Sequence, residues 1–259
     1  MKNTALLIFS FFCFFIFFSC GDENFEPYPN QGFDIYKGLL PSEYIQTTTD
    51  RNTGAKITTI TTLHFDNLNR LIYVESSISD SIISTQSITY NESNGNVNTY
   101  SIENAKGTQL YTYEYKKSDI ILEHRTFKTI HPPNYPEIEP YTRTLSVSGD
   151  KLIKSEDPRE IKTNICKYDK KGNLIESNKE HYDYNNLTGI MSNTKTPKWL
   201  FVALEGNLPF SNNLVNNCII GKNRATYKYE YDKDLHPKYP KKVIINNNEV
   251  ITIKYILAK

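Results

Sequence analysis

The sequence predicts an all-β protein: an antiparallel meander of hairpins that forms a strongly twisted or half-barrel sheet, with one short helix near residues 197–205. Three observations support this prediction. Apolar and polar residues alternate along most of the chain, a turn motif recurs between the alternating segments, and one segment carries helix-start and helix-stop signals instead. Alternation with a period of two is typical of strands that bury one face.

The alternating segments run from about Ile45 to the last residues of the sequence. In each of them, β-branched and aromatic side chains share one parity, while Thr, Lys and Glu fill the other. Residues of these types are enriched in half-buried strands. The clearest runs are Ile57–Phe65, Tyr111–Tyr115, Leu145–Val147, Tyr227–Tyr231 and Ile251–Leu257.

A turn motif separates several of these strands. It consists of an aromatic residue, Asp or Asn, a few polar residues that often include Gly or Asn, and an aliphatic residue that begins the next strand. Asp and Asn side chains bond to the backbone two residues on, Gly supplies a positive φ, and repeated hairpins predict a meander. The copies are Phe65–Leu71, Tyr90–Val97, the shorter Val147–Leu152, Tyr168–Leu174 and the degenerate Tyr231–Leu235.

The segment 196–206 interrupts the alternation and contains Trp199, the only tryptophan of the chain. Thr196 suits the N-cap, Pro197 the first helical position, and Gly206 the position just past the end. We expect this helix to close one end or face of the curved sheet. The side chains expected to be buried there are Trp199, Leu200 and Val202.

The first residues are typical of a secretory signal. Lys2 is followed by the uncharged apolar run Ala5–Phe18 and the small residue Ser19. As a helix this run would cover roughly 21 Å, which is less than the roughly 30 Å of a membrane's hydrocarbon core. Residues 1–19 are therefore predicted to be a signal peptide rather than a membrane span.

The segment Phe17-Phe18-Ser19-Cys20 resembles the lipobox of bacterial lipoproteins, in which a small residue precedes a cysteine that is acylated before cleavage. The resemblance implies a lipid, such as palmitate, on Cys20. It also implies a lipid-anchored protein at the outer membrane, on the cell surface or the periplasmic face. Phe17 departs from the family, which most often has Leu there. The alternative is an ordinary cleaved signal that leaves Cys20 free or paired.

Residues 20–36 are polar and proline-containing, and we expect a flexible tether there before a single β-rich domain at residues 37–259. The acidic pair Asp22-Glu23 is similar to sorting signals that send lipoproteins to the cell surface in the phylum of Bacteroides and Flavobacterium. The alternative is a linker that is merely well solvated.

Charge argues against a nucleic-acid partner. The chain has 30 Lys and Arg residues and 29 Asp and Glu residues. Cleavage would remove Lys2 and no acidic residue, which leaves a formally neutral protein. Its lysines are scattered among acids and tyrosines and form no basic stripe that could neutralise phosphates. The expected partners are a membrane, through the lipid on Cys20, and an envelope protein or glycan.

Two cysteines remain after the predicted processing, because Cys13 leaves with the signal and Cys20 carries the lipid. Cys166 and Cys218 would then stand in a compartment where disulfides form. They could make one Cys166–Cys218 bridge or remain two separate buried thiols, and both alternatives stay open because the sequence gives no distances.

The unit Tyr168–Leu174 resembles the YD repeats of Rhs-type surface proteins, and the C-terminal part of the chain is similar to a family of uncharacterised Bacteroidetes lipoproteins. In that family a YD-type hairpin is followed by a short helix, an Asn-rich loop, a Tyr-x-Tyr-x-Tyr-Asp strand and a final hairpin. The resemblance implies a twisted or half-barrel antiparallel sheet and no activity. The matching segments are Tyr168–Tyr184, Pro197–Glu205, Asn212–Asn217, Tyr227–Asp232 and Val243–Leu257.

The strong catalytic and metal motifs are missing: the chain has no G-x-S-x-G, H-E-x-x-H, Walker loop, dinucleotide fingerprint or C-x-x-C pair. We therefore predict no catalytic residue, metal or cofactor. The acidic turns Asp66–Asn69 and Asp232–Asp234 could supply calcium ligands. Their Asp and Asn residues are better explained as the residue types that hairpin turns prefer. The histidines have no ligand-like spacing; they are His64, His124, His131, His181 and His236.

The 19 tyrosines suit either packing on a sheet with a thin core, which we favour, or a concavity that binds carbohydrate or peptide. The leading hypothesis is a non-catalytic envelope lipoprotein that serves as a binding or scaffold module for an envelope polymer or protein. The rival is a surface hydrolase acting on a glycan or peptide. A third hypothesis is a purely structural envelope protein.

Overall fold

A computed structural model describes residues 38–50, 53–129, 138–160, 163–178, 180–204, 206–211, 218–222, 225–231 and 239–259. The predicted signal peptide and tether lie outside this part of the chain, as do Cys20, the pair Asp22-Glu23, His131, His236 and the turn Asp232–Asp234. The predictions made for them remain predictions.

The described residues form an antiparallel meander of 17 strands, as the alternation predicted. The long strands come first: β1 (Leu39–Thr49), β2 (Lys56–Phe65), β3 (Leu71–Ile78), β4 (Ser81–Tyr90), β5 (Val97–Asn104), β6 (Gly107–Lys117), β7 (Ile120–Thr129) and β8 (Tyr141–Ser148). Shorter strands follow: β9 (Lys151–Glu156), β10 (Asn164–Ile165), β11 (Lys167–Tyr168), β12 (Leu174–Ser177), β13 (Glu180–Tyr184), β14 (Ile219–Lys222), β15 (Ala225–Tyr231), β16 (Pro240–Ile245) and β17 (Glu249–Leu257).

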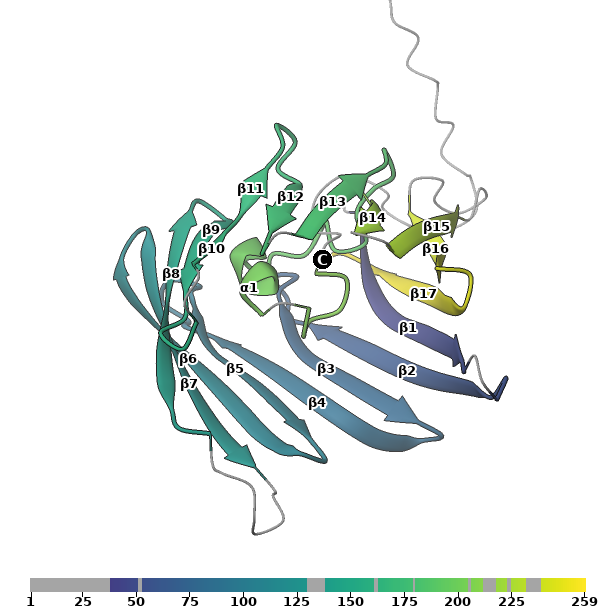
Figure 1. Cartoon of the computed structure of the whole chain (residues 1–259), viewed down its shortest axis with the longest axis horizontal. Helices are drawn as coiled ribbons and strands as arrows, with labels where there is room; N and C mark the ends of the chain where they lie inside the picture. The colour runs from purple at the N-terminus through teal and green to yellow at the C-terminus, as the bar shows by residue number, and fades with distance from the viewer. Residues whose placement is uncertain are drawn as a thin grey trace, which may run out of the picture. The chain divides into compact units, whose positions relative to one another are not determined.

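The sheet curls until its first and last strands meet. Within β1, Tyr44 pairs with Thr61 of β2 on one side and with Ile253 of β17 on the other. At the far side of the sheet, β10 pairs with β9 and β11 pairs with β12, with Cys166 alone between β10 and β11. The result is a nearly closed, barrel-like sheet (Figure 1), which goes further than the half-barrel that the sequence allowed.

The predicted helix is confirmed as α1 (Lys198–Ala203), which lies inside the curve of the sheet near β9 and β11 (Figure 1). Its apolar residues face the core as expected, because Trp199, Leu200 and Val202 are all buried. The Trp199 ring packs edge-on against Tyr113 of β6, with ring centroids 5.3 Å apart. Within the described residues, no helix is long and apolar enough to cross a membrane.

The start of this helix differs from the prediction. Pro197, and not Thr196, occupies the N-cap, and no side chain within the helix caps it. Thr196 is buried, and its Oγ1 instead accepts a 2.7 Å hydrogen bond from the backbone N–H of Leu71. The first helical N–H, that of Lys198, donates to Asp150 Oδ1 at 2.7 Å. The Asp150 carboxylate of the β8–β9 turn therefore caps the start of the helix, a role predicted for Thr196 from the sequence.

The turn motif acts as its chemistry predicted. Asp66 Oδ1 accepts the backbone N–H groups of Leu68 and Arg70, both at 2.9 Å. Asp169 Oδ1 does the same for Lys171 and Asn173 at 2.8 Å. Asp66 also pairs with the Arg70 guanidinium at 2.7 Å, so its oxygens are engaged within the turn. No group of three or more His, Cys, Asp or Glu residues in the described ranges could hold a metal ion.

Candidate functional site

Tyrosine hydroxyls tie neighbouring hairpins together at the end of the sheet where the motif turns lie. Each donates to a backbone carbonyl of an earlier strand, and several of the accepting residues are the aliphatic ends of the motif. The bonds join Tyr90 to Leu71 at 2.9 Å, Tyr168 to Leu152 at 2.8 Å, and Tyr184 to Leu174 and Tyr255 to Pro240 at 2.7 Å. Tyr229 bonds to Ile219 in the same way. The hydroxyl groups of these tyrosines are therefore engaged in contacts within the sheet.

A buried ion cluster lies beneath the helix on the inner face of β7 and β8. The Glu123 and Arg143 side chains are almost fully buried, and Arg143 Nε lies 3.0 Å from Glu123 Oε1. Arg125 also pairs with Glu123, and Arg143 donates to the carbonyl of Ala203, the last residue of α1. Burial lowers the pKa of Arg125, but the Glu123 charge outweighs it, and the net pKa is raised. This cluster fastens the helix to the sheet.

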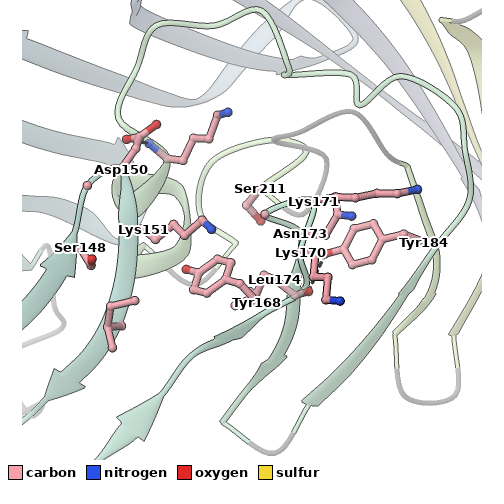
Figure 2. A pocket seen from close by; sticks show the side chains of 14 residues that line it. Ser148, Asp150, Lys151, Tyr168, Lys170, Lys171, Asn173, Leu174, Tyr184 and Ser211 are labelled. Carbon is pink, nitrogen blue, oxygen red and sulfur yellow. Dashed lines mark hydrogen bonds between the residues drawn. The ribbon is translucent and has the colours of Figure 1, made fainter. Parts of the chain in front are cut away.

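An open groove lies between two copies of the turn motif. One side is the β8–β9 turn, and the other is the β11–β12 turn (Figure 2). The groove has a volume of about 640 Å³, which lies in the range of small-ligand sites. Its lining residues are Ser148, Gly149, Asp150, Lys151, Ile153, Tyr168, Lys170, Lys171, Gly172, Asn173, Leu174, Tyr184, Lys198 and Ser211.

The groove is basic. Four lysines line it against a single carboxylate, that of Asp150. Asp150 is committed to the N–H of Lys198, and burial raises the pKa of its carboxyl above the usual value, although that N–H lowers it in part. The ammonium of Lys151 lies 5.2 Å from the centroid of the Tyr168 ring, a cation–π distance. The arrangement favours an anionic ligand.

The local sequence shapes both walls. Gly149 and Gly172 have φ values of +58° and +87°, a conformation that side-chain-bearing residues rarely adopt. No atom lies within 4 Å of a Cβ built on Gly149, so this glycine is required by the turn and not by crowding. Tyr168 and Tyr184 project their rings toward the groove (Figure 2), while their hydroxyls hold backbone carbonyls. The rings are therefore fixed in place.

The described residues also form two smaller cavities of about 280 Å³ each, and the first is lined in part by Phe201 and Val202 of α1. Glu180, Tyr182 and Lys222 line the first, in which Glu180 pairs with Lys222 at 3.0 Å. The second is mostly aromatic and aliphatic and is bordered by Tyr44 and Phe210, whose rings are 5.0 Å apart. Asp150 lines the groove, and Glu180 lines the first smaller cavity. Neither of these two described cavities contains the pair of carboxylates that a glycan hydrolase would need.

The remaining candidates from the sequence are dispersed. Cys166 and Cys218 are two separate buried thiols here: Cys166 Sγ lies 3.7 Å from Ser177 Oγ, and Cys218 Sγ lies 3.1 Å from the Thr188 carbonyl oxygen. Burial raises the pKa of Cys218 to about 12.

Three histidines lie in the described part of the chain, and the structure does not gather them. His124 Nδ1 lies 2.9 Å from Thr142 Oγ1 on the outer face, and His181 Nδ1 lies 4.0 Å from Glu176. The His64 ring is 5.7 Å from that of Tyr73. None of them lines a described cavity.

Sequence reasoning did not identify the lysine groove. The signal was present in two turns, Gly149-Asp150-Lys151 and Asp169-Lys170-Lys171-Gly172, each of which has a lysine within two residues of a motif glycine. It could not be used because only the folded sheet brings these turns to face each other.

No family model and no curated protein matches this chain. Among solved structures, the chain is similar to a porin-like protein from Bacteroides uniformis. The two share 12% sequence identity with a TM-score of 0.34, over 84% of this chain and 97% of the other.

Proposed function

We propose that this protein is a lipid-anchored protein of the outer membrane that acts as a non-catalytic binding module for an envelope polymer. The observation that carries the proposal is the groove between the β8–β9 and β11–β12 turns, whose lysines and fixed tyrosine rings form a basic, half-open recess. Such recesses with a few convergent polar groups are the default binding sites of folded domains.

The anchor in this proposal is Cys20, through the lipobox-like segment that ends at it. Cross-strand ion pairs on the outer face of the sheet support attachment through a lipid and not through this face itself. These join Lys167 to Glu176 at 2.9 Å, Lys242 to Glu230 at 2.8 Å, and Lys254 to Glu43 at 2.6 Å. Charges are costly in apolar surroundings, so these ion pairs favour water at their own positions, and the lipid would supply the attachment.

The hairpin repeats and the order of the C-terminal elements support membership of the uncharacterised Bacteroidetes lipoproteins. The hairpin β11–β13, the helix α1, the strand β15 and the final hairpin β16–β17 follow the order of that family. An envelope glycan fits the groove better than a folded partner protein, because a recess of about 640 Å³ accepts a chain segment and not a domain surface.

Lipid attachment is tested by growing cells with an alkyne-bearing palmitate and following the full-length protein. Wild type should take up the label and sediment with membranes. Cys20→Ser should lose the label and either appear in the soluble fraction or accumulate as precursor. Cys13→Ser is the matched control, since this residue leaves with the signal, and it should label normally. Equal labelling of Cys20→Ser would refute the anchor.

Polymer binding is tested separately with the purified full-length protein in detergent. Polysaccharide extracted from the envelope of its own cells should co-sediment with the protein, without an increase in reducing ends during incubation. Binding should weaken when Lys170 and Lys171 are both changed to Gln. A rise in reducing ends would instead identify the rival function, a hydrolase.

A further inference from the structure

We propose that the groove recognises an acidic polysaccharide, through sugar carboxylates held between the lysines of its two walls. This inference rests on the proposed binding function and names the chemical class of the ligand. Lys151 lies on the side of the β8–β9 turn, and Lys170 and Lys171 lie on the facing turn (Figure 2). Lys198, whose backbone N–H bonds to Asp150 of the β8–β9 turn, also lines the groove. A chain running along the groove would meet cations on both sides.

The positive charge of the groove is only partly offset: the Asp150 carboxylate interacts with Lys198, and Lys171 Nζ donates to Asn186 Oδ1 at 3.4 Å. None of its four lysines forms a salt bridge with a described residue, whereas lysines elsewhere on the sheet do, as Lys167 does with Glu176 and Lys222 with Glu180. The carboxylate of Asp169, at the base of the β11–β12 turn, accepts hydrogen bonds from the backbone N–H groups of Lys171 and Asn173 and from the Asn173 side-chain amide. Four like charges against one carboxylate cost free energy, which an anionic ligand would relieve.

The aromatic walls argue for a sugar and not for a bare anion. The rings of Tyr168 and Tyr184 line the groove, and their hydroxyls are engaged with the carbonyls of Leu152 and Leu174. A fixed ring offers its face to the apolar side of a sugar without losing further side-chain entropy. Ser148 and Ser211 add hydroxyl groups at the rim that can bond to sugar hydroxyls.

The kind of cation also matters. Among the described residues that line the groove, every cation is a lysine and none is an arginine. Arginine forks suit the planar, two-pronged recognition of phosphate and carboxylate. Lysine is a point charge on a flexible stem, which suits carboxylates repeated along a polymer whose register can shift. The groove should therefore bind carboxylates repeated along a sugar chain and not a single anionic group in one fixed position.

The test uses the full-length protein in detergent and polygalacturonate as the probe. Its methyl ester is the matched neutral polymer, and polyphosphate is the matched anion without sugar. The groove variant is Lys170→Gln/Lys171→Gln, whose side chains are exposed. The control variant, Lys228→Gln/Lys241→Gln, removes the same charge from exposed positions of β15 and β16. Affinities are measured by titration calorimetry at low and at high salt.

We expect wild type to bind polygalacturonate more tightly than the ester, and less tightly as salt rises. The groove variant should bind about two- to thirtyfold more weakly, since two partly screened ion contacts are lost. The control variant should bind as wild type does. Equal weakening in both variants would show binding by net charge alone and would overturn the proposed site.

The other outcomes separate the two proposals. Equal affinity for the polymer and its ester would overturn the acidic class and leave the polymer-binding function standing. Equal affinity for polyphosphate would overturn the role of the sugar. If neither pectic probe nor the envelope polysaccharide of the cells bound, the proposed function would fail as well.

Discussion

Arg143 and Glu123 form an ion pair inside the curved sheet, with Nε and Oε1 3.0 Å apart and with side chains exposed by only 3% and 0%. The pair stands on neighbouring strands, and its guanidinium also reaches the last carbonyl of α1, that of Ala203. Breaking a buried pair leaves a desolvated charge without its partner, which costs about 3–5 kcal/mol. This contact therefore connects the stability of the sheet to the position of the helix.

Glu123→Gln should lower the free energy of unfolding by about 3 kcal/mol, because Arg143 and Arg125 would both lose their counter-charge. Urea unfolding followed by the fluorescence of Trp199 measures the change. Glu114→Gln is the matched control, since Glu114 pairs with Lys116 and His124 on the exposed surface. That variant should lose much less stability, because solvent screens the exposed pair. Similar losses in both would contradict a special role for the buried pair.

Asp150→Ala should lower the stability by about 1 kcal/mol, since it removes the acceptor for the first N–H of α1. Burial raises the pKa of Asp150 in the folded state. The folded protein then holds a proton that the unfolded chain has lost, so this group's contribution falls as the pH rises from about 4 through the raised pKa. Asp150→Asn should flatten that part of the pH profile in urea unfolding; an unchanged profile would exclude Asp150 as its source.

Alkaline pH should unfold the sheet cooperatively. Burial raises the pKa of Tyr115 to about 12 and raises the pKa values of Tyr90, Tyr168 and Tyr184 as well. The unfolded chain loses these protons near pH 10, so the free energy of unfolding falls by about 1.4 kcal/mol per pH unit for each such tyrosine above that pH.

Tyrosinate absorbance and far-UV circular dichroism, recorded together, test this. The late part of the tyrosinate signal should rise only as the sheet signal disappears, and Tyr168→Phe should reduce its amplitude. Complete ionisation near pH 10 with an intact sheet would show that these hydroxyls are not buried as described.

Gly38→Ala and Gly54→Ala form a pair that separates backbone strain from crowding. Both glycines have a positive φ, +77° and +71°. A Cβ on Gly54 would meet nothing within 4 Å, whereas one on Gly38 would lie 2.4 Å from Asn193 Nδ2. Gly54→Ala should cost about 1–2 kcal/mol, the strain alone.

Gly38→Ala should cost clearly more, because Asn193 would have to leave its 2.9 Å hydrogen bond to the Leu39 carbonyl. Thermal and urea unfolding of both variants give the comparison. Equal costs would mean that Asn193 moves aside without penalty.

Much of the fold could be predicted from the sequence because its causes are local. Alternation identified the strands, because one face of each strand is buried. The motif at Tyr168–Leu174 forms the predicted turn, in which Asp169 accepts a backbone hydrogen bond and Gly172 has a positive φ. The same local signals located α1 and the burial of Trp199.

Tertiary structure decided the contacts between segments far apart in the chain. Thr196 carries a good local signal for an N-cap, yet its hydroxyl bonds to Leu71, and Asp150, 48 residues from Lys198, caps the helix. The closure through β1 and the facing lysine turns likewise depend on register and curvature summed over many strands. A local pattern fixes which way each side chain points; which side chains meet across the sheet is set only when all the strands have paired.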